Sequence, residues 1–524
     1  MLPMEITAPR IEYGLLAPVL VIFAGACLGV LAEALVPRQT RRVVHMVITP
    51  VSLAAALIMT LLNWKSGAQG VVAVYSLAID GPTYFMWTIL IIFSAAALLL
   101  FAEKKIENAS VFAPQAAAVP GSPAEREASR SRMEHTEVFP LALFAMLGMM
   151  LFPASNDLIT MFVALEILSL PLYLLCGLAR RRRLLSQEAA LKYFLLGALS
   201  SAFFIYGAAL LYGYSGSFTL AAIDDSIRNS EQGLGLLLAG MALLGVGLLF
   251  KFSAVPFHSW TPDVYAGAPT PVTGFMAACT KIAAVGALMR VFYVGLGADR
   301  WDWQPTMAII AVLTMAVGSV LAITQTDVKR MLAYSSIAHA GFMMVAFVGA
   351  SQAATGSPPG SLTSVSSVMF YLVAYGAATI GAFALVTMVR DATGEANLLN
   401  SWVGLGRRSP LAATIFSIFM LSFAGIPLTS GFVGKWAVFA AAWTGGIQWL
   451  VVVAVVISVV AAFFYIRVIV LMFFVEPSKM ATSVVRPGWT TLTAVGLGVV
   501  ATVAFGIFPG PLLALAQQAG EFIR

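Results

Sequence analysis

Four charged residues stand inside stretches of the sequence that are otherwise almost wholly apolar. Glu166 lies within DLITMFVALEILSLPLYLL, Lys251 follows GVGLLF, Lys281 is central in GFMAACTKIAAVGALM, and Lys435 ends TSGFVGK. An amine in apolar surroundings gives up its proton more readily than one in water, so a buried lysine can both accept and release protons. These residue types therefore favour proton transfer, with Glu166 as the counter-charge.

Each of these intramembrane charges also has a structural alternative. Lys192, in SQEAALKYFLLG, lies nearer a helix end and could extend to the membrane surface, and Arg290 is expected to do so or to anchor a span. Lys251 and Lys281 are harder to explain in this way, because two deep cations on neighbouring spans repel each other unless water, a carboxylate or loss of a proton relieves them. A charge at mid-bilayer costs roughly 2.5–3.5 kcal/mol on insertion scales, so we interpret these residues as functional.

His339 is a further candidate proton carrier, within the apolar segment YSSIAHAGFMM. An imidazole titrates near neutral pH and could pass a proton between waters, although a hydrogen-bonded core histidine is an equal alternative. The four histidines and three cysteines show no metal-ligand spacing, and the cysteines stand singly in apolar surroundings. The sequence therefore predicts no metal site and no disulfide framework.

Proline interrupts two of the apolar stretches at the level of these charges. Pro256, in KFSAVPFHSWTPDVY, has no N–H, so the carbonyl of Phe252 loses its helical partner. In LSFAGIPLTSGFVGKW, Pro427 frees the carbonyl of Phe423, and Lys435 follows about 12 Å along a continuous helix at 1.5 Å per residue. Simple kinks are the alternative, but broken helices at membrane depth are typical of transporters, where they face protein or a watered cavity.

The elements that must position these residues are membrane-spanning helices. The chain has 524 residues, 60% of them hydrophobic and 10% charged, and a mean hydropathy of +0.91, which excludes a water-soluble globular protein. A helix needs about 20 apolar residues to cross the hydrocarbon layer. Windows of this kind are centred near residues 23, 53, 91, 145, 167, 201, 241, 283, 315, 340, 378, 425, 460 and 502. We therefore predict an all-α integral membrane protein of about 14 transmembrane helices.

The basic residues orient this predicted bundle. With the N-terminus outside, the inner loops hold nineteen of the 30 lysines and arginines and the outer segments hold five, which agrees with the positive-inside rule and places both termini outside. The remaining six lie within spans or at their edges: Lys192, Lys251, Lys281, Arg290, Lys435 and Arg467. Because the basic residues form no continuous patch, the net charge of +6 indicates membrane topology and no nucleic-acid partner.

The two interruptions fall in spans 7 and 12, which predicts two inverted five-helix repeats, about spans 4–8 and 9–13. The predicted organisation is residues 1–136 for the first three spans and an inner loop, 137–297 for the first repeat, 298–476 for the second, and 477–524 for the last span. The inner loop, about residues 103–137, is rich in Ala, Ser, Pro, Glu and Arg and is interpreted as a flexible connector.

Four strings of the sequence resemble a known family. FVALEILSLPLYLL, KFSAVPFHSWTPDVYAGAPTPVTGF with Lys281 following, VKRMLAYSSIAHAGFM and AGIPLTSGFVGKW are similar, in order and spacing from about residue 137 to 475, to the antiporter-like subunits of bacterial proton-translocating NADH:quinone oxidoreductase, respiratory complex I. The form TPDVYAGAPTPV, a lysine in both span 8 and span 12, and a chain that ends just after span 14 resemble subunit N most. The inner loop is longer than expected for the family.

The resemblance implies a role for each charged residue. It implies that Glu166 and Lys192 form a modulating pair and that Lys251 is the central proton-carrying lysine on a broken helix. It also implies that Lys281 connects this lysine to Lys435, the terminal lysine of the exit half-channel.

The resemblance further implies a proton-translocating subunit of the membrane arm, multi-pass in the bacterial plasma membrane. Its partners would be the other membrane-arm subunits, through them the peripheral arm, and membrane lipid. No cofactor is expected in this chain, since NADH, FMN, iron–sulfur clusters and quinone would be bound by partner subunits. The alternatives are a subunit of a multisubunit Na⁺/H⁺ antiporter, a purely structural brace and, more distantly, a solute carrier, although no residue set would select an organic substrate.

Overall fold

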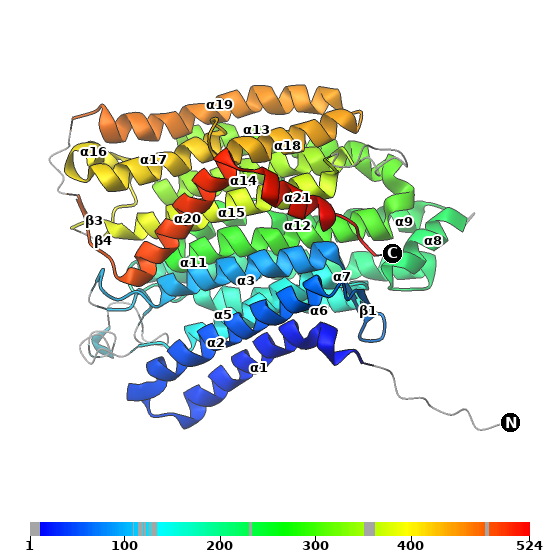
Figure 1. Ribbon diagram of the computed structural model, residues 1–524, viewed down its shortest axis with the longest axis horizontal. Coiled ribbons are helices and arrows are strands. Elements are labelled where there is room, and N and C mark those ends of the chain that lie inside the picture. The colour runs from blue at the N-terminus through cyan, green and yellow to red at the C-terminus, as the bar shows by residue number, and fades with distance from the viewer. Residues whose placement is uncertain are drawn as a thin grey trace.

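The apolar stretches form long helices that run side by side in the computed structural model of the chain (Figure 1). Inside a bilayer every backbone N–H and C=O needs a partner within the protein, and an α-helix supplies these partners within one segment. The structure describes residues 11–107, 109–113, 119, 122–124, 127, 134–229, 233–350, 362–392, 394–476 and 482–523.

The first half of the chain holds two groups of elements. The first group consists of α1 (Tyr13–Leu35), α2 (Arg38–Lys65), the antiparallel hairpin of β1 (Gly70–Val72) and β2 (Leu77–Ile79), and α3 (Gly81–Phe101). The second consists of α5 (Val138–Ala154), α6 (Leu158–Cys176), α7 (Arg183–Ser215), α8 (Leu220–Asn229), α9 (Gly235–Phe252), α10 (Trp260–Gly267), α11 (Thr270–Phe275), the π-helical η1 (Met276–Thr280), α12 (Lys281–Arg290), the π-helical η2 (Val291–Gly295) and the 3-10 turn η3 (Gly297–Asp299).

The second half continues the same pattern. It consists of α13 (Arg300–Thr324), α14 (Val328–Val348), α15 (Ser364–Met388), β3 (Val389–Asp391), β4 (Gly394–Glu395), the 3-10 turn η4 (Leu399–Trp402), α16 (Leu405–Arg408), α17 (Pro410–Ala424), α18 (Ser430–Thr444), α19 (Gln448–Phe473), β5 (Ser483–Val484), α20 (Trp489–Ile507) and α21 (Gly510–Gln518). Strand β3 pairs antiparallel with both β4 and β5, so this small sheet ties the end of α15 to the segment before α20.

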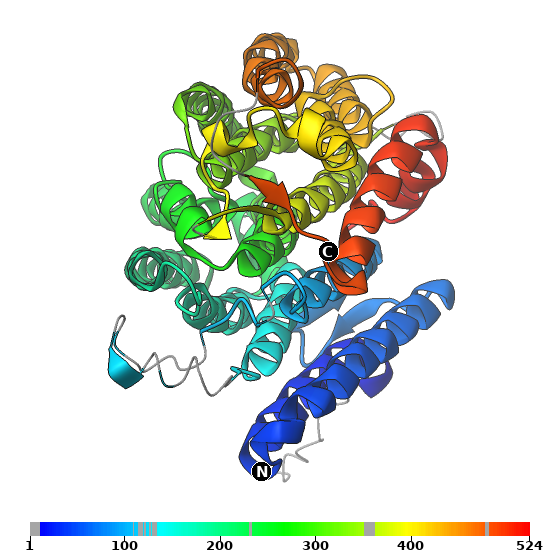
Figure 2. The ribbon, with the colours of Figure 1, turned by 90° about the vertical axis from the view of Figure 1, so that its left-hand side faces the viewer.

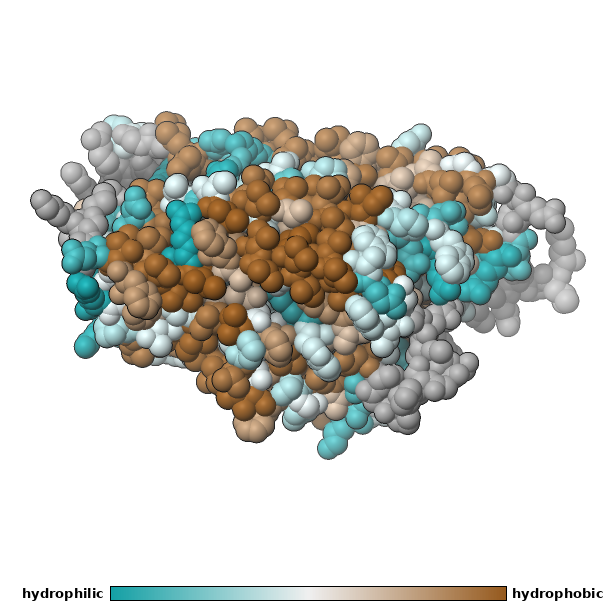
Figure 3. Space-filling view, turned by 90° about the horizontal axis from the view of Figure 1, so that it is seen from above, coloured by the Kyte–Doolittle hydropathy of each residue, from teal (hydrophilic) through white to brown (hydrophobic). Residues whose placement is uncertain are grey.

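Thirteen of the fourteen predicted window centres fall on helices and the twelfth, near residue 425, falls at the break between α17 and α18, which confirms the all-α membrane fold. Among the described residues, twelve helical segments are long and apolar enough to cross a membrane, and α5 and α17 are shorter apolar helices. Figure 3 shows a hydrophobic belt between two ends at which hydrophilic side chains gather. Helix α1 begins, and the described chain ends, at the same end of the bundle (Figure 1), as an even number of spans requires. Which end faces outside stays a prediction.

The centre of the bundle is built from the spans that carry candidate residues. The segment Thr270–Gly295, which holds Lys281, and helix α15 are wholly buried over their apolar windows, and α14, which holds His339, is 94% buried. Helices α1 and α2 lie at one edge and α19 at the opposite edge (Figure 2). Lys281 is therefore enclosed by protein on all sides, where a charge must find its partners within the chain.

Aspartates fix where several spans begin. The side chains of Asp80, Asp157 and Asp327 stand at the N-caps of α3, α6 and α14 and accept hydrogen bonds from backbone N–H groups of the first turn. A carboxylate there satisfies N–H groups that have no helical partner and interacts favourably with the positive end of the helix dipole. These caps set the ends of helices that hold candidate residues, Glu166 on α6 and His339 on α14.

Arg290 does not extend to the membrane surface, so that part of the sequence-based expectation is wrong. Its guanidinium and the carboxylate of Asp80 are both fully buried, with Nη2 2.9 Å from Oδ1. Its Nε also donates to the carbonyl oxygen of Pro153 at 2.6 Å. The backbone N–H of Ile523 donates to the other oxygen of Asp80, at 3.1 Å. This ion pair therefore anchors α12 to α3, to the end of α5 and to the C-terminal segment.

Part of the predicted inner loop, residues 108, 114–118, 120–121, 125–126 and 128–133, lies outside the described residues. Its described ends make specific contacts. Glu107 pairs with Arg390, and Phe112 forms a backbone bridge with Ala179. Thr136 donates to Glu33, which also binds His45 of α2. The domain boundaries predicted from the sequence stay a prediction.

Glu103 joins the start of this loop to the beginning of α20. Its carboxylate accepts hydrogen bonds from the N–H of Lys105 at 2.7 Å, the N–H of Gly488 at 2.7 Å, and the hydroxyl of Thr491 at 2.8 Å. Burial raises the pKa of this carboxyl, but the hydrogen bonds from Thr491, Lys105, Gly488 and Thr490 outweigh burial and leave the pKa below its ordinary value of 4.5.

We expect Glu103→Gln to weaken the anchoring of α20 by about 1.5–3 kcal/mol, the range for a hydrogen bond to a charged group. Because the folded pKa is lowered, the stabilisation is complete above the ordinary pKa and is lost only as the pH falls below it. Amide hydrogen exchange of residues 488–491 in the purified protein should therefore be slow from pH 7 to about 5 in the wild type, and faster throughout in the variant. The exposed Glu12→Gln is the control, and equal exchange in all three proteins would contradict the assignment.

Candidate proton-transfer site

The seventh span is broken beside Lys251. Helix α9 ends at Phe252, Ser253 adopts a left-handed conformation with φ of 65°, and α10 begins only at Trp260. Pro256 has no N–H to donate to the helix. The carbonyl of Phe252 therefore needs another donor, as the sequence predicted. That donor is Lys281, whose Nζ lies 3.1 Å from the carbonyl oxygen. The break in span 7 is therefore also a contact with the lysine of span 8.

Lys251 is enclosed by aromatic rings. Its side chain is 3% exposed, and its Nζ lies 5.1 Å from the ring centroid of Tyr193 and 5.4 Å from that of Tyr173. Among the described residues the amine has no hydrogen-bond partner. Ring faces stabilise an ammonium only weakly compared with a carboxylate, so the charged and neutral forms of this amine are closer in free energy than those of a lysine in water.

Glu166 is the acidic group whose charge acts on Lys251. It lies half-buried on α6, and one of its oxygens accepts a hydrogen bond from the hydroxyl of Ser201 on α7. No ion pair joins Lys251 to this carboxylate among the described residues. Changes in the charge or position of Glu166 therefore reach Lys251 through space.

Lys192 makes its ion pairs elsewhere. Its Nζ lies 2.8 Å from Asp263 on α10 and 2.7 Å from Glu188 on its own helix, and its side chain is 43% exposed. The other oxygen of Asp263 binds Arg330 of α14 at 2.9 Å. The structure thus does not bring Lys192 to Glu166. It connects Lys192 to the second half of the broken span 7.

The twelfth span is broken in the same manner. Helix α17 ends at Ala424 and α18 begins at Ser430, so the chain between them is not helical. The Nζ of Lys435 donates to the carbonyl oxygen of Ala424 and to the hydroxyl of Ser458, both at 2.9 Å. The break thus places the amine of Lys435 at the open C-terminal end of α17.

Lys281 and Lys435 occupy equivalent chemical positions. Each ammonium binds a carbonyl at the C-terminal end of a half-helix, that of α9 or of α17. Such an end carries unpaired carbonyls and a partial negative charge, which stabilise a cation by roughly 0.3–2 kcal/mol and which transporters use to bind Na⁺ and H⁺. Lys281 also directly follows the π-helical turn η1, a local widening of the helix that is frequent at functional sites.

Gly425 leaves the space that Lys435 occupies. Its φ is +83°, in the left-handed region, and a Cβ built there would lie 2.8 Å from Cδ of Lys435. We expect Gly425→Ala to cost about 1–2 kcal/mol in backbone strain and to displace the amine from Ala424, with a several-fold slower proton transfer. The measurement is proton uptake by vesicles that contain the protein. Gly496→Ala, at an exposed helical site with open space, should leave uptake unchanged, and unchanged uptake in Gly425→Ala would contradict the expectation.

His339 lies between two buried tyrosines. Its Nδ1 is 2.6 Å from the hydroxyl of Tyr371 and its Nε2 is 3.2 Å from that of Tyr465. The charges of Lys281 and Lys435 both act on the imidazole. Both expectations from the sequence are consistent with this geometry, since a hydrogen-bonded core histidine with a hydroxyl on each nitrogen is also arranged for proton relay.

Several residues of the site could not be recognised as functional from the sequence alone. Tyrosines on apolar helices are ordinary packing residues, and neither Tyr371 nor Tyr465 stands in a recognisable motif. Asp263 lies in the string SWTPDVY, which suggested only a break, and Ser458 is one hydroxyl in a long apolar run. Within the described part of the chain, no three His, Cys, Asp or Glu side chains gather as metal ligands would.

The chain is similar to characterised families over its whole length. Residues 155–461 match the model of the family described as NADH:quinone oxidoreductase/Mrp antiporter, TM. The NADH-quinone oxidoreductase subunit N of Rhodococcus opacus (strain B4) is 56% identical, covering 99% of this chain and 98% of that protein. The protein of the same name from Nocardioides sp. (strain ATCC BAA-499 / JS614) is 55% identical, covering 99% and 100%.

The chain is also similar to chains in solved structures. A chain of respiratory complex I from Thermus thermophilus with bound Aureothin superposes with a TM-score of 0.74 at 34% identity, covering 96% of this chain and 100% of that chain. A chain of the Mrp complex from Dietzia sp. DQ12-45-1b superposes with a TM-score of 0.79, covering 97% of each chain, but at 20% identity it shows the fold alone. This chain therefore belongs to the subunit N family of NADH-quinone oxidoreductase, the antiporter-like subunits of the membrane arm of respiratory complex I.

Proposed function

We propose that this chain moves protons across the membrane through its buried lysines, coupled to electron transfer from NADH to quinone in partner subunits. One observation carries the proposal: two deep lysines, Lys281 and Lys435, each bind a carbonyl exposed by a broken span, and His339 is hydrogen-bonded to two tyrosine hydroxyls. Structural lysines would be satisfied by carboxylates, whereas these amines have only neutral partners among the described residues. A neutral partner favours the charged amine less strongly than a carboxylate does, so it opposes loss of the proton less.

The proposed order of transfer follows the arrangement of the residues. Lys251 accepts a proton near Glu166 and passes it toward Lys281 at the same helix break. His339, with its two tyrosine hydroxyls, then joins Lys281 to Lys435. Water is expected to bridge the intervals, since a proton moves only along chains of hydrogen bonds. Lys435 releases the proton toward the outer side.

We further propose that Glu166 and Lys192 modulate this transfer. In the present arrangement Lys192 is bound to Asp263 and Glu188, and Glu166 is free to act on Lys251. In a second arrangement Lys192 would leave Asp263 for Glu166, and the weakened negative field would favour release of the proton from Lys251. Asp263 sits on α10, beyond the break, so the same exchange would also act on the broken span.

The proposal places this chain among other membrane-arm subunits of complex I and, through them, the peripheral arm. Its similarity to a chain of Thermus thermophilus complex I supports such partners. NADH, FMN, iron–sulfur clusters and quinone would be bound in those subunits. The bacterial plasma membrane, with both termini outside, is the proposed location.

Lys281→Met tests the proposal in the assembled complex reconstituted into vesicles. We expect electron transfer from NADH to a soluble artificial acceptor to be unchanged, because it involves only partner subunits. Proton transfer through this chain should slow by about 10²-fold or more, the range for loss of a positioned acid–base group. Lys65→Met, at an exposed helix end, is the matched control.

Other results would favour the alternatives. Full proton uptake with Lys281→Met would mean that the lysine is structural. Na⁺/H⁺ exchange by vesicles without NADH oxidation would instead indicate a subunit of a multisubunit antiporter. Poor assembly with normal uptake per complex would indicate a brace.

A further inference from the structure

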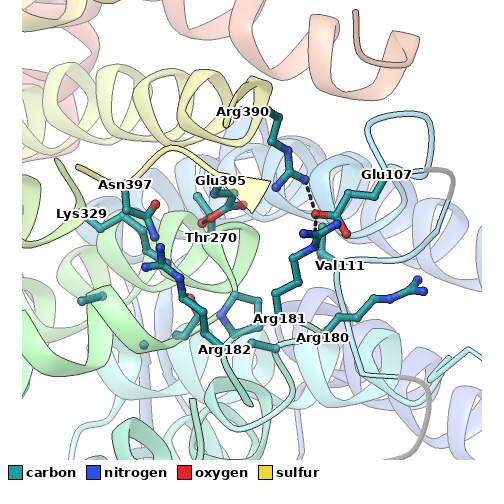
Figure 4. Close-up of a pocket in the computed structure, with 15 residues that line it drawn as sticks. Glu107, Val111, Arg180, Arg181, Arg182, Thr270, Lys329, Arg390, Glu395 and Asn397 are labelled. Carbon is teal, nitrogen blue, oxygen red and sulfur yellow. Dashed lines mark hydrogen bonds and ion pairs between the residues drawn. The ribbon is translucent and has the colours of Figure 1, made fainter. Parts of the chain in front are cut away.

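A strongly basic cavity lies at the end of the bundle where α7 and α14 begin (Figure 4). Its volume is about 60 Å³, room for roughly four to six waters or one small polyatomic anion. The cationic side chains that line it are Arg180, Arg181, Arg182, Lys329 and Arg390, and the anionic ones are Glu107 and Glu395. The walls therefore carry a net of three positive charges. None of these residues belongs to the proposed proton path.

The two carboxylates do not neutralise this group. Glu107 binds Arg390 at 2.7 Å and Arg181 at 3.2 Å, so one carboxylate is shared by two guanidinium groups. Glu395 accepts a hydrogen bond from the hydroxyl of Thr270 at 2.5 Å. Figure 4 shows Arg181 and Arg390 meeting at Glu107, while Arg182 extends along the opposite side of the cavity toward Asn397. Like charges confined to one small cavity repel each other unless an anion relieves them.

Two of the buried cations that line the cavity have N–H groups without a hydrogen-bond partner among the described residues. The side chain of Arg390 is 8% exposed, and its Nε has no hydrogen-bond partner among the described residues. Lys329 is 2% exposed and gives one of its three N–H groups to the carbonyl of Ala268 at 2.7 Å. A buried guanidinium N–H without a partner loses its hydration for no gain, so its presence here points to a ligand. Planar guanidinium groups match the geometry of phosphate oxygens.

We propose that this cavity binds a phosphate group, either the headgroup phosphate of an anionic phospholipid or free phosphate. The site draws on both halves of the chain, with Arg182 from the α6–α7 connection and Lys329 and Arg390 from α14 and the β3 hairpin. A bound phosphate therefore joins the first repeat to the second at the end of the bundle. The inference does not depend on the proposed proton path.

The test uses the complete detergent-purified complex, stripped of lipid, and two labelled probes, inorganic phosphate and dioctanoyl phosphatidylglycerol. Equilibrium dialysis counts the saturable sites per complex for each probe. We expect one site that is weakened about tenfold or more in Arg182→Gln and Arg390→Gln, since one hydrogen bond to a charged group corresponds to at least that change. Arg407→Gln, an exposed arginine outside the cavity, is the matched control and should bind as the wild type does.

Each result has a defined meaning. A site for inorganic phosphate that the variants lose identifies free phosphate as the ligand class, and a site for the lipid alone identifies a headgroup. Arg182 is exposed and makes no ion pair with described residues, so its variant should assemble even if Arg390→Gln, which breaks the pair with Glu107, does not. Equal binding of both probes by the wild type and Arg182→Gln, or no binding by the wild type, would overturn the proposal.

Discussion

Lys251→Arg is expected to slow proton transfer through this chain by about 10²-fold or more. Lysine can exchange its proton when the surroundings change, whereas arginine stays protonated at any accessible pH. The amine has no hydrogen-bond partner among the described residues. Its protonated form is therefore stabilised only by the aromatic rings around it and by the negative charge of Glu166. A fixed positive charge at this point would block relay to Lys281.

The measurement is NADH-driven proton uptake by vesicles that contain the assembled complex. Lys251→Met, which has a similar volume and no titratable group, separates loss of titration from steric effects of the larger guanidinium. The exposed Lys65→Arg should pump as the wild type does. Normal proton uptake by an assembled Lys251→Arg complex would contradict the proposed proton path.

Arg290→Met is expected to destabilise the chain by about 3–5 kcal/mol, because it leaves the fully buried carboxylate of Asp80 without its cation. The loss includes the hydrogen bond to the carbonyl of Pro153. The complex should be less abundant in membranes and should dissociate at a lower temperature in detergent.

The double variant Arg290→Met with Asp80→Asn should recover most of this stability, because asparagine keeps an acceptor for the N–H of Thr83 and carries no charge. Arg467→Met, which removes only a hydrogen bond to the carbonyl of Ile323, should cost about 1 kcal/mol. Equal losses in the single and double variants would show that the arginine matters through packing and not through its charge.

The candidate site was only partly predictable from the sequence. Prolines marked both broken spans, since a missing N–H is a local property that frees a carbonyl wherever the residue stands. The partner of that carbonyl was not local. Lys281 lies 29 residues beyond Phe252, and only the packing of neighbouring spans brings them together. In span 12 the carbonyl that Lys435 binds is that of Ala424, eleven residues before it in the sequence.

Ion pairs are even harder to predict from the sequence. Lys192 and Glu166 are both visible as charges, but which carboxylate binds which amine depends on the rotation and depth of three helices. In the structure Lys192 forms an ion pair with Asp263, which lies beyond the break in span 7. Arg290 was expected to reach the surface or to anchor a span, and it anchors one as a fully buried partner of Asp80, the N-cap residue of α3.

By itself, the sequence determined the class of protein and its chemistry. Apolar length and alternating loop charge require a bundle of membrane helices, because lipid offers no partner to a backbone or to a charge. Lysines placed within those spans indicated proton transfer. Tertiary structure alone decided what surrounds these groups: carbonyls at helix breaks for Lys281, aromatic rings for Lys251, and tyrosine hydroxyls for His339. Such contacts join distant segments, and helix packing, which local sequence does not encode, sets them.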